Sequence, residues 1–496
     1  VDVWASRDPD CKLLYISVSL ATMHTISCPT VLLPARKGSV RRTPTAVVAP
    51  DVAFRRSIAT PVRSRQSQPV RLSGGRANGV RCQASDGEEL DLVEARALLQ
   101  RALGTHNNEL SGPGACFGLG EDGAWDSATV GNPVVRCFLG DDEERWVMYY
   151  HGRKYLDDKK MDGSHPESLD SGFVGLATSF DGVNWKRGVG AVSLRGDRTA
   201  YSAGTDVGTV LTPNTEDWWV FDTCHVGVGD VQMLNSDHVQ TFGGAGVYWM
   251  FYHGGDFNET HENDDGTGAV SEGLRRRPGL ALSQDGINFA RIESDHYTGA
   301  LFDFGKEGEW DALGCANPQV VSLGKDKLRM YYDGAETPNT PSSIGMATSE
   351  SGFKWEKAGK VFPPGPPGSF DEAGVSRPWV LPLPPNKGGG FLMYYEGKSK
   401  EGVYSIGAAT SADGVEWGRN EEPVLAASPD AEAWDAGGVR APCPVIMAGG
   451  KLRLYYSGTD KAGSPTNGIG VATCEAEDLF TFTRRVSQKV TELSDS

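Results

Sequence analysis

Three acidic residues stand at comparable points of successive stretches of similar sequence: Asp230, Asp333 and Glu396. Two carboxyl groups that converge on one pocket are the minimum for hydrolysing a glycosidic bond, because one protonates the leaving oxygen while the other activates water or attacks the sugar. The three residues are therefore our candidate acid and base groups. Their alternative role is structural, as buried partners in ion pairs with Arg377 and Arg440.

These acids belong to two series of polar residues that change from one stretch to the next. The first series is the residue X in the pattern Tyr-Tyr-X-Gly or its equivalent: His151, His253, Asp333, Glu396 and Ser457. The second is the residue before a proline, or before Gly229 in one copy: Asn132, Val228, Asn317, Arg377 and Ala441, with Asp230 and Arg440 beside it. Different side chains at equivalent positions of a rigid repeated framework are typical of a binding site. We expect six of these residues to contact a substrate: Asn132, His151, His253, Asn317, Arg377 and Arg440.

The framework that carries both series is a sequence repeat, clearest from Arg377 to Trp417. It holds an apolar run after a proline, the aromatic run 391–395 and the small-residue run 405–410, each suited to a β-strand. Asp413-Gly414 then predicts a tight hairpin before a fourth, outer strand. Four further copies match this pattern, over 146–185, 248–289, 328–355 and 452–482.

An aromatic residue followed by Asp precedes every copy, and the proline or glycine stands seven residues after that Asp. Because these acids recur in every copy, we interpret them as side chains that cap a tight turn: Asp126, Asp222, Asp311, Asp371 and Asp435. Five such copies predict an all-β fold, a five-bladed β-propeller with four antiparallel strands per blade. The predicted blades are about 125–188, 221–292, 310–357, 370–419 and 434–485. Both polar series would then lie near one end of the central channel.

Bulk composition restricts the class of protein. The chain has 496 residues and a net charge of −17, and residues 1–85 carry 13 Lys or Arg against four Asp, so the remainder carries −26. A body this acidic repels phosphate backbones, which argues against a nucleic-acid partner. No apolar run is long enough to span a membrane. The nine cysteines lack a C-x-x-C pair, which favours free thiols over a disulfide frame or a zinc site.

The first 85 residues differ from the rest in composition. From Met23, the first methionine, to Cys82 the segment is rich in Arg, Ser, Thr, Pro and Val and holds one acid, Asp51. This composition predicts a transit peptide, with the chloroplast favoured over the mitochondrion, and a disordered basic tail is the alternative. Residues 1–22 are interpreted as sequence upstream of the true start. Within 86–124, near-helical apolar spacing over 88–103 predicts a short N-terminal helix, followed by a glycine-rich loop.

The blade pattern and the count of five resemble the arabinanase, levansucrase and invertase superfamily, the five-bladed propeller glycosidases related to glycoside hydrolase family 43. The resemblance covers residue 125 to the C-terminus and implies a channel site with an Asp on each of the first two blades and a Glu on the third. At those places this chain has Asn132, Asp230 shifted past Gly229, and Ala316-Asn317. An amide cannot act as a general base, so either the acids have moved to other blades or the activity has been lost.

A second resemblance is to mannoside phosphorylases, which share the Trp-acid pair and the Tyr-His-Gly pattern and hold phosphate with basic residues. That resemblance implies a phosphate-binding role for four residues: His151, His253, Arg377 and Arg440.

The sequence therefore predicts a glycosidase-like propeller that acts on a furanoside, a fructoside or a related glycoside. One alternative is a non-catalytic propeller that binds a carbohydrate or a protein partner through the same channel mouth, and another is a glycoside phosphorylase. A carbohydrate ligand is expected, without a cofactor. A channel metal such as calcium and the oligomeric state are left open.

Overall fold

The structure is a computed structural model of the whole chain. It describes the ranges 110–139, 144–154, 172–188, 208–234, 246–258, 275–324, 327–385, 388–475 and 478–485, together with Gly273 and a few short strands elsewhere. The chain divides into two compact units, residues 1–103 and 104–496. In the first unit the described strands form two pairs, β1 (Asp2–Ala5) with β2 (Leu14–Ser17) and β3 (Cys82–Gln83) with β4 (Glu89–Leu90).

In the second unit each predicted repeat folds into an antiparallel sheet of four strands in chain order. The sheets are β6 (Thr129–Leu139), β7 (Glu144–Arg153), β8 (Phe173–Ser179) and β9 (Lys186–Arg187); β11 (His225–Leu234), β12 (Val247–Gly255), β15 (Arg276–Ser283) and β16 (Ala290–Ile292); β17 (Gly314–Ser322), β18 (Leu328–Ala335), β19 (Ser343–Ser349) and β20 (Glu356–Phe362); β21 (Gly374–Pro382), β22 (Phe391–Lys398), β23 (Tyr404–Ser411) and β24 (Gly418–Arg419); and β25 (Gly438–Ile446), β26 (Leu452–Thr459), β27 (Gly468–Cys474) and β28 (Thr483–Arg484). Additional strands are β10 (Thr209–Leu211), which pairs with β8, β5 (Ala115–Gly118), which pairs with β27, and the pair β13 (Thr260–His261) and β14 (Val270–Ser271).

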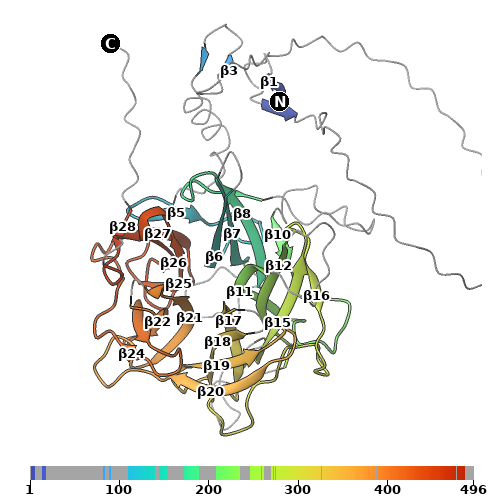
Figure 1. The fold of residues 1–496 in the computed structure, drawn as a ribbon, viewed down its shortest axis with the longest axis vertical. Coiled ribbons are helices and arrows are strands. Elements are labelled where there is room, and N and C mark those ends of the chain that lie inside the picture. The colour runs from blue at the N-terminus through green and yellow to red at the C-terminus, as the bar shows by residue number, and fades with distance from the viewer. Residues whose placement is uncertain are drawn as a thin grey trace, which may run out of the picture. The chain divides into compact units, whose positions relative to one another are not determined.

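The five sheets are arranged around a common centre, with β6, β11, β17, β21 and β25 innermost (Figure 1). Each inner strand contacts the next, and β25 contacts β6, the inner strands of the last and first sheets. Backbone pairing between Val130 and Asn467 also joins the first and last sheets. The Tyr455 hydroxyl of the last sheet donates to the Gly182 carbonyl of the first at 2.8 Å. The buried apolar side chains form four clusters, each of which contains residues from neighbouring sheets.

Each inner strand has an irregularity at the position of its proline or glycine. The register between first and second strands shifts there in all five sheets. In four sheets the residue before the proline has a positive φ, which is uncommon for residues other than glycine: Asn132 (54°), Asn317 (50°), Arg377 (49°) and Ala441 (52°). They are the four non-glycine residues of positive φ in the described part of the chain. Strained backbone of this kind gathers at functional sites.

The recurring acids before each sheet have a different structural role from the predicted turn cap. In every repeat the carboxylate is buried and accepts a hydrogen bond from a tyrosine of the second strand, and it pairs with a cation of the outer strand. These pairs are Asp126 with Arg187, Asp222 with Arg291, Asp311 with Lys357, Asp371 with Arg419 and Asp435 with Arg484. The sequence did not show this because the tyrosine and the cation are distant from the acid along the chain. We call each Asp–Tyr–cation group a blade clasp.

Two local predictions are corrected. The Asp-Gly turns join strands through six-residue connections, such as 180–185 between β8 and β9, because Asp181 Oδ1 accepts the N–H groups of Val183 and Asn184, both at 2.8 Å. The glycine does adopt the predicted positive φ, 70° at Gly182. In the predicted helix over 88–103, Glu89–Leu90 forms a short strand and 91–103 lies outside the described residues.

Several other predictions remain untested by the described residues. The transit peptide over 1–85 is described only at β1, β2 and β3. Residues 155–171, 189–207 and most of 259–274, in and between the first two repeats, lie outside the described residues. Among the helices that are described, none has the length and apolar content to cross a membrane.

Candidate functional site

The two predicted polar series lie side by side at one end of the inner strands, as the repeat predicted. In four sheets residue X pairs with the residue that precedes the irregular segment: Gly131 with His151, Ala316 with Asp333, Ser376 with Glu396 and Arg440 with Ser457. In the second sheet His253 pairs one residue earlier, with Gly227. The series also interlock between sheets. In four cases the backbone N–H of the positive-φ residue donates to residue X of the preceding sheet: Asn132 to Ser457 Oγ (2.8 Å), Asn317 to His253 Nδ1 (3.2 Å), Arg377 to Asp333 Oδ1 (2.9 Å) and Ala441 to Glu396 Oε2 (3.1 Å). Residue X is thus held in place by its neighbouring sheet.

Glu396 is a firmly ionised carboxylate whose oxygens are already occupied. Its Oε1 accepts hydrogen bonds from Ser376 Oγ and Arg440 Nη2, both at 3.0 Å. Arg377 Nε lies 3.4 Å from Oε2, the oxygen that also accepts the Ala441 N–H. Burial alone would raise the pKa of Glu396, but Arg440 and Arg377 lower it to about 2. Glu396 therefore positions the two arginines and carries a negative charge at any ordinary pH.

Asp333 has the opposite environment. It is 6% exposed, and burial raises its pKa above the ordinary value although Arg276 and the Arg377 N–H act in the other direction. Oδ1 accepts both of its described hydrogen bonds, from Asn317 Nδ2 at 2.8 Å and from the Arg377 N–H. Among the described residues Oδ2 has no such partner, so it is the oxygen available to a ligand. Two nearby carboxyl groups with pKa values shifted in opposite directions suit distinct acid and charge-holding roles.

Three side chains of the second series contact one another, those of Asn132, Asn317 and Arg377. Asn132 Nδ2 donates to the Val228 carbonyl at 2.6 Å and lies 3.4 Å from Asn317 Oδ1, while Arg377 donates to Asn132 Oδ1. A cavity of about 20 Å³ lies among these residues and the prolines that follow them. Because this cavity is so small, a ligand would have to bind beside it, at the ends of the inner strands, which we call the mouth.

Asp230 lies apart from the other two candidate acids. Its carboxylate is fully buried, pairs with Arg136 and accepts hydrogen bonds from Gln232 Nε2 at 2.6 Å and from the Val320 N–H at 3.1 Å. The residue pairs with Phe251, beyond the irregular segment, and does not line the central cavity. These bonds fit a structural role, but the ion-pair partner is Arg136 of the first sheet and not the predicted Arg377 or Arg440. Its catalytic role stays a prediction.

Replacing Asp230 with Asn is expected to lower the free energy of unfolding by about 1.5–3 kcal/mol, because Arg136 loses a charged hydrogen-bond partner. Chemical denaturation of the full chain measures this change. Any activity of the folded variant should be unchanged. A variant of normal stability that has lost all activity would instead make Asp230 the catalytic acid or base of the first prediction.

Sequence reasoning missed several residues of the mouth. Arg153, His225 and Arg276 come from β7, β11 and β15, and all three approach the predicted residues His151 and His253. His151 and His225 have ring centroids 5.2 Å apart, and those of His225 and His253 are 5.5 Å apart. Arg153 Nη2 donates to His225 Nδ1 at 3.0 Å. The available signal was the position after the glycine of Tyr-Tyr-X-Gly, which Arg153 occupies in the first sheet and which His225 and Arg276 flank in the second, where both pair with Gly255.

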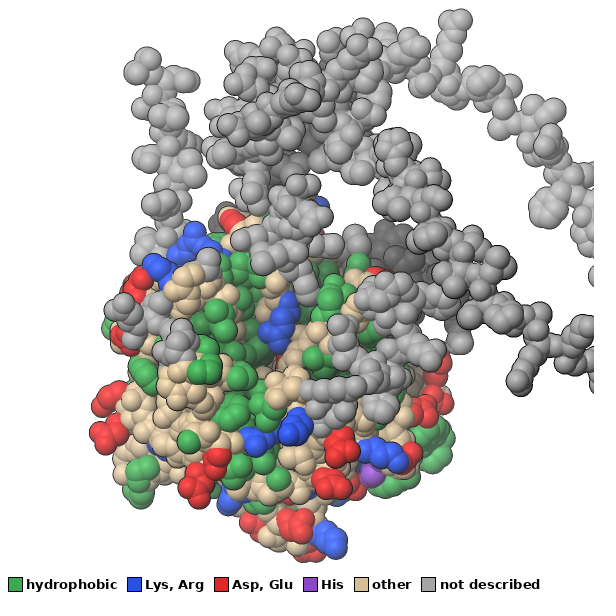
Figure 2. All heavy atoms as spheres, in the orientation of Figure 1, with side chains coloured by type: hydrophobic (Ala, Val, Ile, Leu, Met, Phe, Trp, Pro, Cys, Tyr) green, Lys and Arg blue, Asp and Glu red, His purple; other side chains and the backbone are tan. Residues whose placement is uncertain are grey.

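The mouth has more cationic than anionic side chains. Four arginines lie there, and they electrostatically influence one another or the same neighbours: Arg153, Arg276, Arg377 and Arg440. Their described carboxylate neighbours are Asp333 and Glu396. Arg440 also stacks on Tyr404, 3.8 Å from its ring centroid. On the face shown in Figure 2, a Lys or Arg side chain lies at the central hollow while acidic side chains gather toward the outer edge.

Three buried nitrogen atoms of this mouth have no hydrogen-bond partner among the described residues: His151 Nε2, Arg276 Nε and Arg440 Nε. Buried polar groups are normally satisfied, so such atoms indicate a missing ligand or water. Two of the three are arginine donors, which require an acceptor. The excess of positive charge and the unsatisfied donors together describe a site suited to an oxyanion.

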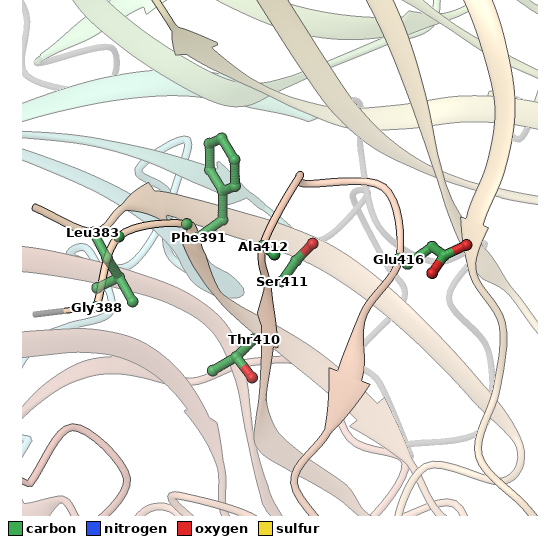
Figure 3. Close-up of a pocket in the computed structure, with 9 residues that line it drawn as sticks. Leu383, Gly388, Phe391, Thr410, Ser411, Ala412 and Glu416 are labelled. Carbon is green, nitrogen blue, oxygen red and sulfur yellow. The ribbon is translucent and has the colours of Figure 1, made fainter. Parts of the chain in front are cut away.

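A larger surface hollow, of about 390 Å³, lies far from these groups on the fourth sheet. It is lined by Leu383, Phe391, Thr410, Ser411, Ala412, Glu416 and three glycines, and Figure 3 shows Phe391 and Glu416 pointing in different directions. No reactive groups converge there. Within the described part of the chain no group of three or more His, Cys, Asp or Glu side chains is placed to hold a metal ion.

Comparison with known proteins finds no matching family model and no matching curated protein. Among solved structures the chain is similar to a glycosyl hydrolase from Bacteroides ovatus (17% identity over 75% of this chain and 97% of that one, TM-score 0.49). It is also similar to a structure of the GH130 family of mannoside phosphorylases that contains hydrolases of β-1,2 mannosidic linkages in Candida mannan (17%, 77% and 99%, 0.48). A third is β-1,2-mannobiose phosphorylase from Listeria innocua bound to β-1,2-mannobiose (14%, 71% and 90%, 0.47). At these values the likeness assigns neither a family nor an activity to this chain.

Proposed function

We propose that the five sheets are the blades of a closed five-bladed propeller and that its channel mouth is a glycoside-active site. Closure is supported by the backbone pairing and the tyrosine hydrogen bond between the first and last sheets. The observation that carries the site is the contrast between Asp333, buried with a raised pKa and one open oxygen, and Glu396, fully bonded and ionised. Asp333 protonates the leaving glycosidic oxygen, and Glu396 holds Arg377 and Arg440 in place.

Phosphorolysis fits this arrangement better than hydrolysis. Inverting hydrolysis needs a second free carboxylate to activate water. Among the described residues the other two candidate carboxylates, Glu396 and Asp230, are bonded to arginines. Phosphate is itself the nucleophile in phosphorolysis: one of its oxygens bonds to the anomeric carbon, the bond from that carbon to the leaving oxygen breaks, and Asp333 gives that oxygen its proton. The arginine excess supplies the charge that phosphate requires.

The test is a panel of furanosides, fructosides and mannosides incubated with the full chain, each with and without inorganic phosphate. Sugar phosphate released only with phosphate supports phosphorolysis. Free sugar released without phosphate supports hydrolysis, the first prediction from the sequence. Thermal stabilisation by a glycoside without any release supports the non-catalytic carbohydrate-binding alternative.

Replacing Arg440 with Ala is expected to weaken phosphate binding roughly 10- to 100-fold, because a charged hydrogen bond contributes about 1.5–3 kcal/mol and each 1.4 kcal/mol is tenfold. The KM for phosphate, or its dissociation constant measured by calorimetry, reports the change. Arg440→Lys should recover part of the affinity, since the charge remains while the forked geometry is lost. Arg329→Ala, on the surface of the third sheet, is the matched control. Equal phosphate affinity in all three variants would remove Arg440 from the site.

A further inference from the structure

Three histidines adjoin the proposed oxyanion site, two of them buried (His225 and His253) and one half-buried (His151), and their nitrogens are not equivalent. Arginine and backbone N–H groups can only donate, so Nδ1 of His225 accepts from Arg153 and Nδ1 of His253 accepts from the Asn317 N–H. Protonating either Nδ1 would break an existing hydrogen bond. His151 Nε2 is different because it is buried and has no partner among the described residues. A proton on His151 Nε2 would cost no described hydrogen bond.

The position of His151 Nε2 is set by the absence of a side chain at Gly172. A Cβ atom built on Gly172 would lie 2.2 Å from His151 Nε2 and 2.5 Å from His225 Nδ1. Both nitrogens therefore face the same small space beside the first sheet. Any larger residue at position 172 would occupy the space into which Nε2 points.

The charges around His151 oppose its protonation when the mouth is empty. Arg153 on β7, Arg276 on β15 and Arg377 on β21 face it, with neutral His225 and His253 on β11 and β12. Asp333 on β18 is linked to this group through Asn317 and His253. Burial and the three arginines lower the pKa of His151 well below its ordinary value. A doubly charged anion held by Arg276 and Arg377 would offset two of these three positive charges.

We propose that the channel mouth binds a divalent oxyanion together with a proton, and that His151 Nε2 accepts this proton. The inference rests on the proposed oxyanion site and adds that the site is proton-coupled. In the ligand-free protein His151 is neutral. When the anion binds, the imidazole becomes a cation that lies next to the anion and adds a charge to those of the arginines.

The coupling fixes the direction of the pH dependence. Anion binding raises the pKa of His151 from its depressed value, so proton uptake occurs between the ligand-free and the anion-bound pKa. Across that window affinity falls as pH rises, by up to about tenfold per pH unit for one proton. Above the anion-bound pKa the affinity no longer depends on this residue.

Calorimetric titration of the full chain with sodium sulfate tests the proposal. Sulfate remains a dianion over the whole range from pH 5 to pH 8, so any proton taken up comes to the protein and not to the ligand. Titrations in buffers of different ionisation enthalpy give the number of protons directly, without any variant. Near pH 6 we expect uptake that approaches one proton, and uptake should disappear in His151→Gln. His296→Gln, a histidine on a loop of the second sheet, should behave like the unmodified chain.

The possible outcomes test the proton coupling separately from the proposed function. Sulfate binding with no proton uptake at any pH overturns the coupling and leaves the oxyanion site intact. Uptake that persists in His151→Gln overturns the assignment to His151. Absence of both sulfate and phosphate binding overturns this inference and phosphorolysis together, whereas glycoside hydrolysis is decided independently by the release of free sugar.

Discussion

Asp333→Asn is expected to lower the rate of glycoside cleavage by about 10²- to 10⁴-fold, the usual contribution of a positioned general acid. Asparagine has nearly the same shape, and its side-chain oxygen can still accept the hydrogen bonds from Asn317 Nδ2 and the Arg377 N–H. The variant should therefore fold and bind its ligand while lacking the transferable proton. Steady-state kinetics on the substrate identified by the panel measure the loss, and ligand-induced thermal shifts check binding.

The pH profile gives an independent check of the same assignment. A general acid must be protonated, so activity should fall as pH rises through the raised pKa of Asp333. Glu396, with a pKa of about 2, stays ionised throughout and adds no second limb in the measurable range. Asp230→Asn serves as the matched control, since it removes a carboxyl group from the inner strands away from the mouth. Full activity and an unchanged profile in Asp333→Asn would exclude Asp333 as the acid.

Asp435→Asn is expected to lower the free energy of unfolding by about 3–5 kcal/mol, the effect of removing one partner of a buried ion pair. Asp435 belongs to the blade clasp of the last sheet. Its Oδ2 accepts from the Tyr456 hydroxyl at 3.0 Å and from Arg484 Nε at 2.7 Å, and the residue is fully buried. The substitution leaves Arg484, itself largely buried, without a charged partner. Denaturant unfolding followed by tryptophan fluorescence measures the change.

A matched control lies in the same loop. Asp430 is exposed, and its Oδ1 accepts only the Glu432 N–H among its described contacts, a bond that asparagine can also accept. Asp430→Asn should therefore change stability by less than about 0.5 kcal/mol. If both variants unfold at the same denaturant concentration as the unmodified chain, the clasp contributes nothing to holding the outer strand.

The fold was largely predictable because its determinants are local. Period-two alternation and aromatic runs define the strands, and glycine at position 182 and its equivalents defines the turns. The five copies share one pattern, so a strand that is weakly indicated in one copy can be assigned from the equivalent strand of another. The predicted N-terminal helix lacked such support, and it is wrong where the structure describes it, at Glu89–Leu90.

The location of the candidate site was also determined by the sequence, since equivalent repeat positions occupy equivalent places around the axis. Asp333 and Glu396 fall at the same point of neighbouring copies, and the structure places both beside Arg377. The shift of Asp230 past Gly229 also appears in the sequence, and its consequence is a position beyond the irregular segment.

Only the tertiary structure decided what each of these groups contacts. Sequence alone weighed catalysis against ion pairs with Arg377 and Arg440 for all three acids, and the structure shows those pairs for Glu396 only. Asp230 pairs instead with Arg136, which comes from another sheet. Sequence reasoning missed Arg276 and His225 for the same reason. The charge state of a carboxyl group depends on burial and on charges within a few ångströms, and these distances exist only when separate sheets pack together. The sequence by itself thus determined which positions lie together at one end of the inner strands, and packing between sheets decided which acid keeps an oxygen without a hydrogen-bond partner among the described residues.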